Sequence, residues 1–97
     1  MMKQIAMEEL GRAAFQNEAG EENQLKYFKV IYQQPNEESL HYGICVEKLK
    51  DDVVLQSEES GAFSDNLNFI ENTINALKDN TITPYTLCEV LDDMLDD

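Results

Sequence analysis

Three stretches in the first two-thirds of the chain are rich in aromatic and β-branched residues and alternate apolar with polar positions. A period of two is typical of strands. Clusters of Pro, Asn, Lys and acidic residues separate the stretches and indicate turns. Because the connections are short, we expect neighbouring stretches to pair as a three-stranded antiparallel meander. The expected strands are 24–34, 40–49 and 53–59, with turns at 35–39 and 50–52.

Two helices are expected after Gly61, where the apolar period lengthens to that of a helix. Ser64 or Asp65 supplies the cap of the first helix. Thr83 and Pro84 start the second, because proline is well tolerated at the first helical position. The second helix carries acids opposite its apolar stripe. The two stripes are Leu67, Ile70, Ile74 and Leu77, and Leu87, Val90, Leu91, Met94 and Leu95; the acidic face holds Glu89, Asp92, Asp93 and Asp96.

The pattern therefore predicts an α+β fold, with a three-stranded antiparallel β-meander followed by two C-terminal α-helices packed on one face. A single sheet needs a cover on its apolar face, and the two helices supply it. We expect one domain over 24–97. The predicted core is Phe28, Val30, Tyr32, Leu40, Tyr42, Ile44 and Val46 from the sheet, with Leu67, Ile70, Ile74, Leu77, Leu87, Leu91 and Met94 from the helices.

The segment 1–23 has a weaker pattern. Its first half favours a helix, but Gly11 interrupts that tendency, and a polar, linker-like stretch follows it. We therefore expect 1–23 to be a weakly structured N-terminal arm.

Charge narrows the choice of partners. Twenty acidic residues against seven basic ones give a formal net charge of −13, and no segment of the chain is basic. Nucleic-acid and anionic-membrane surfaces are therefore not expected partners, because both attract Lys and Arg. Basic proteins, divalent cations or simple solubility fit the charge better. The absence of an apolar signal-like segment and the two widely spaced cysteines indicate the cytoplasm.

The residues offer no catalytic constellation. His41 is the single histidine. On an extended strand it lies roughly 20 Å from Glu47 and roughly 13 Å from Cys45, too far for either pair to form a hydrogen bond. The cysteines and carboxylates match no metal-binding spacing. We assign no catalytic, cofactor-binding or metal-ligating residue.

Two features point instead to interactions. The face of the sheet opposite the helices is predicted to carry Tyr27, Ile31, Cys45 and Val54, which a partner, a second copy or the N-terminal arm could cover. The acids at the C-terminal end lie near the negative end of the helix dipole, where a basic partner or a cation would stabilise them. The candidate interaction residues are Tyr27, Ile31, Val54, Asp92, Asp93 and Asp96.

Two short sequences carry a family resemblance. The stretch TPYTLCEVLDD over 83–93 has the form TPxxLxxVLDD, and YGICVE over 42–47 forms a predicted strand. Together they resemble a family of small uncharacterised bacterial proteins, a domain of unknown function seen in anaerobic Gram-positive species. The resemblance spans about 25–95, leaves the N-terminal arm outside and implies no activity.

We therefore expect a small, acidic, non-catalytic module that binds a protein or itself. One alternative is a small-ligand binder or enzyme whose fold assembles a site near His41, with Tyr42 and Cys45. A pocket that holds His41 with a carboxylate in hydrogen-bond reach would favour this alternative, and an apolar patch without such a pocket would favour the module. A third reading, an acidic mimic of nucleic acid, rests on the charge alone.

Overall fold

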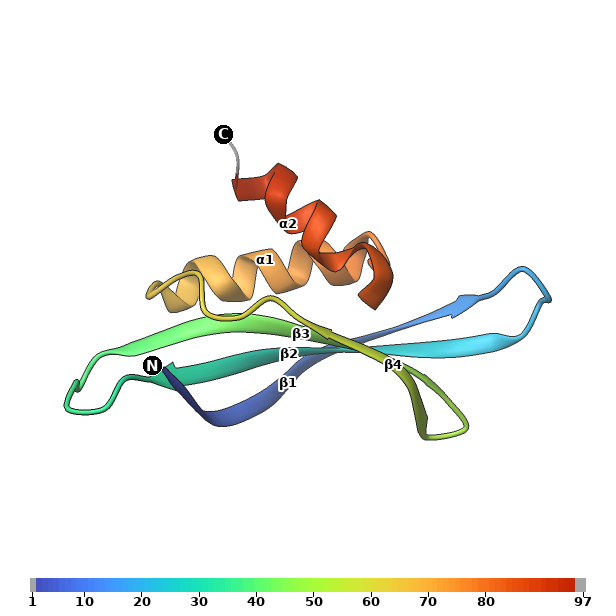
Figure 1. Cartoon of the computed structure of the whole chain (residues 1–97). Coiled ribbons are helices and arrows are strands. Elements are labelled where there is room, and N and C mark those ends of the chain that lie inside the picture. Colours follow the sequence, from blue (N-terminus) through green and yellow to red (C-terminus); the bar gives the residue numbers. More distant parts are fainter. Residues whose placement is uncertain (1, 96–97) are drawn as a thin grey trace.

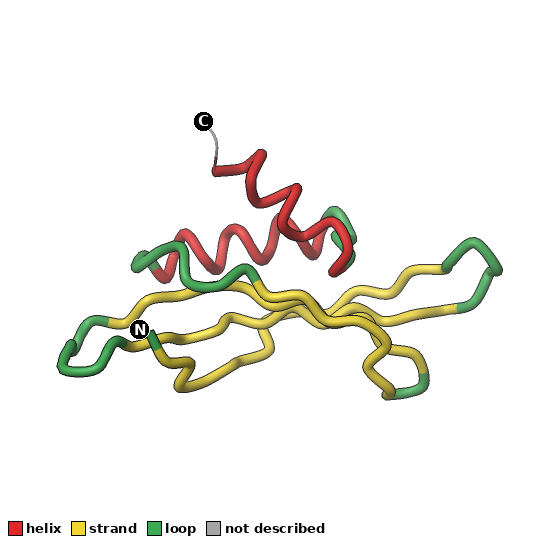
Figure 2. The backbone as a smooth tube through the Cα atoms, in the orientation of Figure 1, coloured by secondary structure: helices red, strands yellow, loops and turns green. Residues whose placement is uncertain are grey.

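The computed structural model describes residues 2–95 and has an α+β fold, in which one antiparallel sheet lies beneath two helices (Figure 1). The sheet has four strands in the order β1-β2-β3-β4, so the expectation of three strands is wrong. Every strand pairs with the next along the chain, and the helices follow (Figure 2). The elements are β1 (Lys3–Gln16), β2 (Glu22–Gln33), β3 (Leu40–Lys50), β4 (Val53–Glu59), α1 (Leu67–Asp79), the 3-10 turn η1 (Pro84–Thr86) and α2 (Leu87–Leu95).

The additional strand, β1, lies within the segment that we expected to be a weakly structured arm. It pairs with β2 from Lys3 to Gln16. Register shifts between Gln4 and Ala6 and between Glu9 and Gly11 break the alternation of its side chains. Most of its residues are exposed because β1 is an edge strand. The usual sequence signature of a half-buried strand is therefore absent.

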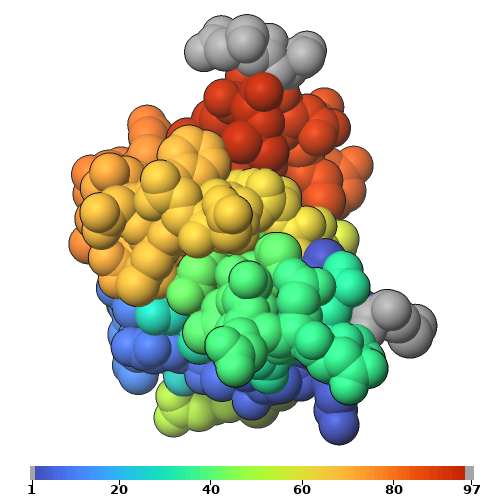
Figure 3. All heavy atoms as spheres, turned by 90° about the vertical axis from the view of Figure 1, so that its left-hand side faces the viewer, coloured from blue at the N-terminus to red at the C-terminus, as the bar shows by residue number. Residues whose placement is uncertain are grey.

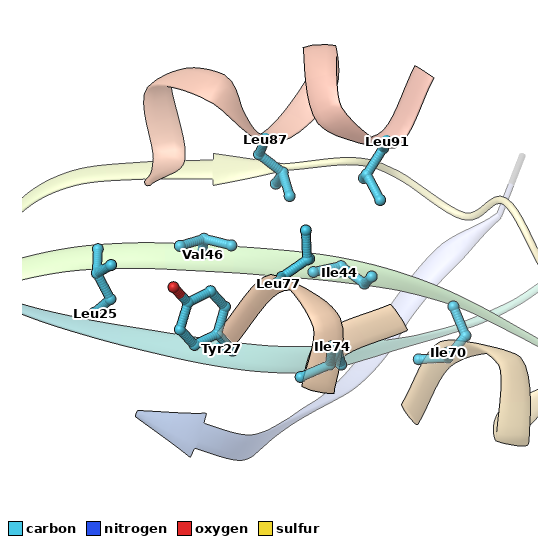
Figure 4. Close-up of a cluster of buried hydrophobic side chains, with 9 residues drawn as sticks. All are labelled: Leu25, Tyr27, Ile44, Val46, Ile70, Ile74, Leu77, Leu87 and Leu91. Carbon is cyan, nitrogen blue, oxygen red and sulfur yellow. The ribbon is translucent and has the colours of Figure 1, made fainter. Parts of the chain in front are cut away.

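Both helices pack on the same face of the sheet, and the core lies between the two layers (Figure 4). Leu87 and Leu91 point from α2 towards the sheet and are buried, as the apolar stripe predicts. Leu67 and Met94, also expected in the core, are 37% and 39% exposed. The buried cluster is Leu25, Tyr27, Ile44, Val46, Ile70, Ile74, Leu77, Leu87 and Leu91.

The orientation predicted for β2 is wrong by one residue, so the other set of alternate side chains faces the helices. Tyr27 pairs with Val46 and lies under the helices, so Phe28, Val30 and Tyr32 point to the opposite face of the sheet. Both sets of alternate positions in β2 are largely apolar. The charged Lys29 belongs to the same set as Tyr27, and its charge favoured the wrong prediction that this set faces solvent. Lys29 is instead only 8% exposed. Its Nζ lies 3.2 Å from a carboxylate oxygen of Glu8 on β1, which compensates for burying the charge.

The ends of α1 are set by local hydrogen bonds. Asn66, rather than Ser64 or Asp65, caps the helix, and its side-chain oxygen accepts a hydrogen bond from the Phe69 N–H at 3.1 Å. At the other end Thr81 has a φ of 52°, a left-handed conformation that usually belongs to glycine. The N–H of Thr81 donates to the Lys78 carbonyl and the N–H of Ile82 to the Leu77 carbonyl. This pair of hydrogen bonds is the Schellman ending of a helix.

The start of α2 differs slightly from the expectation. Pro84 opens the helical segment, as predicted, but Pro84–Thr86 forms a 3-10 turn that leads into the α-helix. Thr83 occupies the cap position without a capping hydrogen bond from its side chain.

Candidate functional site

An apolar groove runs between the C-terminal end of α1 and the outer part of α2. It encloses about 440 Å³ and is lined by Ala76, Leu77, Asn80, Ile82, Val90 and Met94. Asn80 is the one polar side chain among these six residues. In Figure 1, α2 leaves the end of α1 and rises away from the sheet, so the two helices diverge above their shared contact. The groove lies where they diverge.

Exposed carboxylates border this groove. On α2, Asp93 comes one turn after Val90, and Glu89 precedes Val90 on the solvent side. On α1, Asp79 comes one turn after Ala76 and is also exposed. An apolar groove with an acidic border is suited to an apolar side chain that has basic neighbours.

The position of the groove depends on the bend after α1. Thr81 turns the chain so that Ile82 lines the groove, and the carbonyl of Ile82 accepts a hydrogen bond from the Tyr27 hydroxyl at 2.8 Å. Tyr27 is fully buried under the helices. Burial raises its pKa to about 12, because the charged phenolate would lose its hydration. The neutral hydroxyl therefore fastens the α1–α2 connection to the middle of the sheet.

The opposite face of the sheet is the second candidate surface. The register aligns side chains on this face in rows across the strands, such as Arg12, Lys26, Glu47 and Ser57. A neighbouring row consists of Glu9, Phe28, Cys45 and Glu59. The two faces therefore differ in kind: the helix-covered face is an apolar core, and this open face has an apolar centre with charges on both sides.

Cys45 lies in the centre of the open face and is buried to 1% exposure. Its Sγ is 3.6 Å from the Ser57 hydroxyl. Burial, assisted by the carboxylates of Glu59 and Glu47, raises the pKa of the thiol, while the hydrogen bond with Ser57 lowers it. A buried thiol with a raised pKa is a packing side chain rather than a nucleophile.

A third feature is an open hollow of about 370 Å³ at the end of the sheet where β3 begins. It is lined by Met2, His41, Ala62, Phe63, Ser64 and Asp65. Figure 3 views this end of the molecule, with the segment entering β3 in green below the yellow segment that leads into α1. The Nε2 of His41 lies 3.4 Å from a carboxylate oxygen of Glu37. The Ser64 hydroxyl accepts the Asn66 N–H at 3.1 Å, within the turn before α1.

The hollow meets the geometric condition set for the small-ligand alternative, because it contains His41 with a carboxylate close by. It does not assemble the other residues expected there. Cys45 and His41 both belong to the open face but are four residues apart along β3, and Tyr42 belongs to the helix-covered face. Among residues 2–95, no group of three or more His, Cys, Asp or Glu side chains is arranged to hold a metal ion.

The predicted interaction residues do not form one surface. Tyr27 and Ile31 share the helix-covered face, so their placement on the open face is wrong. Val54 is 48% exposed and pairs with Leu49 on the open face. Asp92 and Asp93 are exposed on α2, and Asp96 lies outside the described residues. Sequence reasoning missed the groove itself, because Ala76 and Asn80 only flank the α1 stripe.

Comparison with models of protein families shows which family the chain belongs to. A model of the family of unknown function DUF6514 matches residues 6–97. The chain belongs to this family. The DUF6514 match includes most of β1, whereas the resemblance seen in the sequence did not include this segment. No curated protein and no solved structure matches the chain. The description of this family names no activity.

One further finding concerns membranes. Of the helices in residues 2–95, none has the length and apolar character needed to span a bilayer.

Proposed function

We propose that this DUF6514 protein is a non-catalytic binding module whose groove between α1 and α2 takes the apolar side chains of a basic partner segment. The single observation that carries the proposal is the groove of about 440 Å³ with five apolar lining residues. This volume lies in the range of sites that hold small ligands or anchoring side chains. An amphipathic helix laid into an apolar groove is a recurring mode of protein recognition.

The charge of the molecule supports a basic partner. The formal net charge is −13, and the exposed Asp79, Glu89 and Asp93 are neighbours of lining residues on the two helices that form the groove. Lysine or arginine side chains beside the apolar anchor would meet these carboxylates. Such charges accelerate encounter and select partners more than they add affinity.

The free, unbridged Cys45 and Cys88 support a reducing compartment such as the bacterial cytoplasm as the setting.

The test uses a synthetic amphipathic helix of Leu and Lys, titrated into the ¹⁵N-labelled protein and followed by NMR. We expect shift changes at Ala76, Ile82 and Val90, and weaker binding by Met94→Gln than by Leu95→Gln. Met94 lines the groove, whereas Leu95 is similarly exposed on α2 but does not line it. A scrambled peptide of the same composition has the same charge without an apolar stripe. Equal binding of both peptides would reject the groove as the site.

A small-ligand site at the His41 hollow is the second candidate function. The observation in its favour is the approach of His41 to Glu37 at 3.4 Å beside a hollow of about 370 Å³. Screening a fragment library by NMR would test it. Fragments that shift His41, Ser64 and Asp65 in the wild type but not in His41→Gln would support a site. Shifts that persist in His41→Gln would reject a role for the histidine.

A further inference from the structure

β4 forms one edge of the sheet, and all its residues except Gln56 are exposed (Figure 1). Among residues 2–95, its backbone forms hydrogen bonds with β3 alone. The N–H of Ser60, just after β4, donates to the Ile44 carbonyl at 2.9 Å, so the antiparallel ladder turns Glu58 and Gln56 towards β3 as well. The backbone groups of Ser57 and Glu59 therefore point outwards. Such outward-facing backbone groups are a template for a further strand.

The two edges of the sheet are protected to different degrees. Natural edge strands resist unwanted pairing through lysines, prolines and bulges. The edge strand β1 carries Lys3 and Arg12 and has two register shifts. The edge strand β4 has no Lys, Arg or Pro and one register shift. It begins with the aliphatic residues Val53, Val54 and Leu55, which are 60%, 48% and 54% exposed. β4 is therefore the edge that favours addition of a strand.

Charge indicates which kind of strand would bind there. Exposed carboxylates precede and follow the aliphatic residues of β4; they are Asp51, Asp52, Glu58 and Glu59. In the adjoining rows of β3, Glu47 adds a carboxylate and Lys48 a positive charge, while Lys50 already pairs with Glu21. The edge is therefore strongly negative. Two copies joined through β4 would bring two negative edges together, so the charge selects against a second copy and favours a basic partner.

We propose that β4 binds an extended segment of a basic partner protein, which joins the sheet as a further strand. The segment forms backbone hydrogen bonds with Ser57 and Glu59, and its aliphatic side chains lie beside Val54 and Leu55. Its Lys or Arg side chains meet Glu58 and Glu59. In this mode of recognition the main-chain hydrogen bonds give affinity and the side chains give specificity. No residue of β4 lines the groove between the helices, so this site is separate from the one in the proposed function.

Amide exchange with solvent tests the proposal on the wild-type protein. The probe is the capped peptide Lys-Arg-Thr-Val-Thr-Val-Thr-Arg-Lys, added to the ¹⁵N-labelled full chain and followed by NMR. In the free protein, the amides of Ser57 and Glu59 should exchange rapidly, and those of Gln56 and Glu58 slowly. At a peptide concentration of about ten times its Kd, the Ser57 and Glu59 amides should exchange about tenfold more slowly. The rapidly exchanging amides of the other edge, β1, should be unaffected.

Two control peptides separate the contributions of backbone and charge. A peptide that is N-methylated at its three central residues keeps the charge and side chains but loses backbone donors. It should bind about tenfold or more weakly, because it cannot form the strand hydrogen bonds. A peptide with Glu in place of each Lys and Arg keeps the backbone donors and should also bind more weakly, because like charges then face each other.

Variants of the protein locate the site. Ser57→Pro removes an outward-facing N–H without removing a hydrogen bond to β3, and it should weaken binding. Ser57→Ala is its matched control, since both variants lose the hydroxyl near Cys45, and it should bind as the wild type does. Circular dichroism checks the fold. If Ser57→Pro is not folded, Glu59→Lys replaces it and should weaken binding. Asp79→Lys, the same charge change beside the groove, should then bind normally.

Several outcomes would overturn the proposal. One is a peptide that fails to bind at about 1 mM. Another is slow exchange of Ser57 and Glu59 in the free protein, which would mean that a second copy already covers β4. Equal binding of the parent and N-methylated peptides would exclude strand addition. Shift changes at Ala76 and Val90 in place of β4 would assign the peptide to the groove, and that result would leave the proposed function intact.

Discussion

At the scale of single residues, the most constrained position is the bend between the helices. Thr81 is β-branched and holds a left-handed φ of 52°. That conformation is unfavourable for such a side chain and costs about 1 kcal/mol or more. Its neighbour Ile82 forms hydrogen bonds to Leu77 and to Tyr27 and lines the groove. The cost at Thr81 is therefore offset by the contacts that the bend makes possible.

Thr81→Gly should stabilise the protein. Glycine adopts the left-handed conformation without steric cost, so we expect a gain of about 0.5–1 kcal/mol in the free energy of unfolding. Urea denaturation of the variant and the wild type measures it. Thr83→Gly, two residues further along, is the control and should not stabilise, because Thr83 has a φ of −88°. A destabilised Thr81→Gly variant would mean that the threonine side chain contributes contacts that outweigh its strain.

The buried Tyr27 predicts a pH dependence. Its pKa rises from the ordinary value of 10.0 to about 12 in the folded protein. An acid with a raised folded pKa contributes stability that is complete below pH 10 and is lost as the pH rises towards 12. Tyr27→Phe should cost about 1 kcal/mol at neutral pH through loss of the hydrogen bond to Ile82, and should reduce the alkaline decline. Thermal melts between pH 8 and 11 test this, with the exposed Tyr85→Phe as control.

At the scale of elements, α2 is too short to persist without tertiary contacts. Leu91 is 4% exposed and forms part of the core, whereas Asp93 is exposed in the last turn. Leu91→Ala should destabilise the protein by about 2–4 kcal/mol, since it leaves a cavity. Asp93→Asn should be neutral or slightly stabilising, because it removes a negative charge from the negative end of the helix dipole. Denaturation curves of the two variants measure the changes in the free energy of unfolding. If Asp93→Asn were the more destabilising variant, the acidic face of α2 would be the buried one.

The edge strand β1 belongs to the folded unit. It pairs with β2 along its length, and a side chain at Gly11 would meet the Lys78 side chain of α1 at 2.8 Å, so strand and helix are in close contact. Deletion of residues 2–16 should abolish cooperative unfolding, because it uncovers β2 and removes one wall of the core. A deletion of residues 2–4 is the control and should change the melting temperature by only a few degrees. An unchanged melt after the longer deletion would show that β1 is peripheral.

Sequence reasoning succeeded where one periodicity dominated. The helices were predicted because Ile70, Ile74, Leu87 and Leu91 repeat at helical spacing, and all four are buried. The fold class followed from the order of strands and helices. The face assignment of β2 failed because both of its faces are apolar. Lys29 lies on the helix-covered face, where Glu8 of β1 stabilises its buried charge, and no local pattern in β2 reports this contact.

The candidate surfaces were harder to predict. The groove depends on the angle between α1 and α2, which the Thr81 bend sets, and no local pattern reports that angle. The rows of side chains on the open face depend on the register that brings Arg12 beside Lys26 and Glu47. The sequence predicted that an uncovered face exists, but it placed Tyr27 and Ile31 on the wrong side.

At the scale of the whole molecule, charge opposes compactness. The formal net charge of −13 is carried by a protein with a radius of gyration of 13.9 Å. The Debye length is about 30 Å at 0.01 M salt and about 8 Å at physiological salt. At low salt its carboxylates therefore repel one another across the whole fold, and added salt should raise the melting temperature. Calorimetry from about 10 to 300 mM NaCl tests this. A melting temperature that falls with salt would show that local ion pairs such as Lys29–Glu8 outweigh the general repulsion.

The order of elements along the chain also has a consequence during synthesis. All four strands precede Leu67, the first residue of α1, so the ribosome releases the whole sheet before either helix. The strands can pair early because each lies next to its neighbour in sequence. Until α1 and α2 emerge, the apolar side chains that they cover are open to solvent, in the state in which nascent chains aggregate or bind chaperones. A chain truncated before residue 67 would form the sheet without its two covering helices, and proteases would cleave it readily.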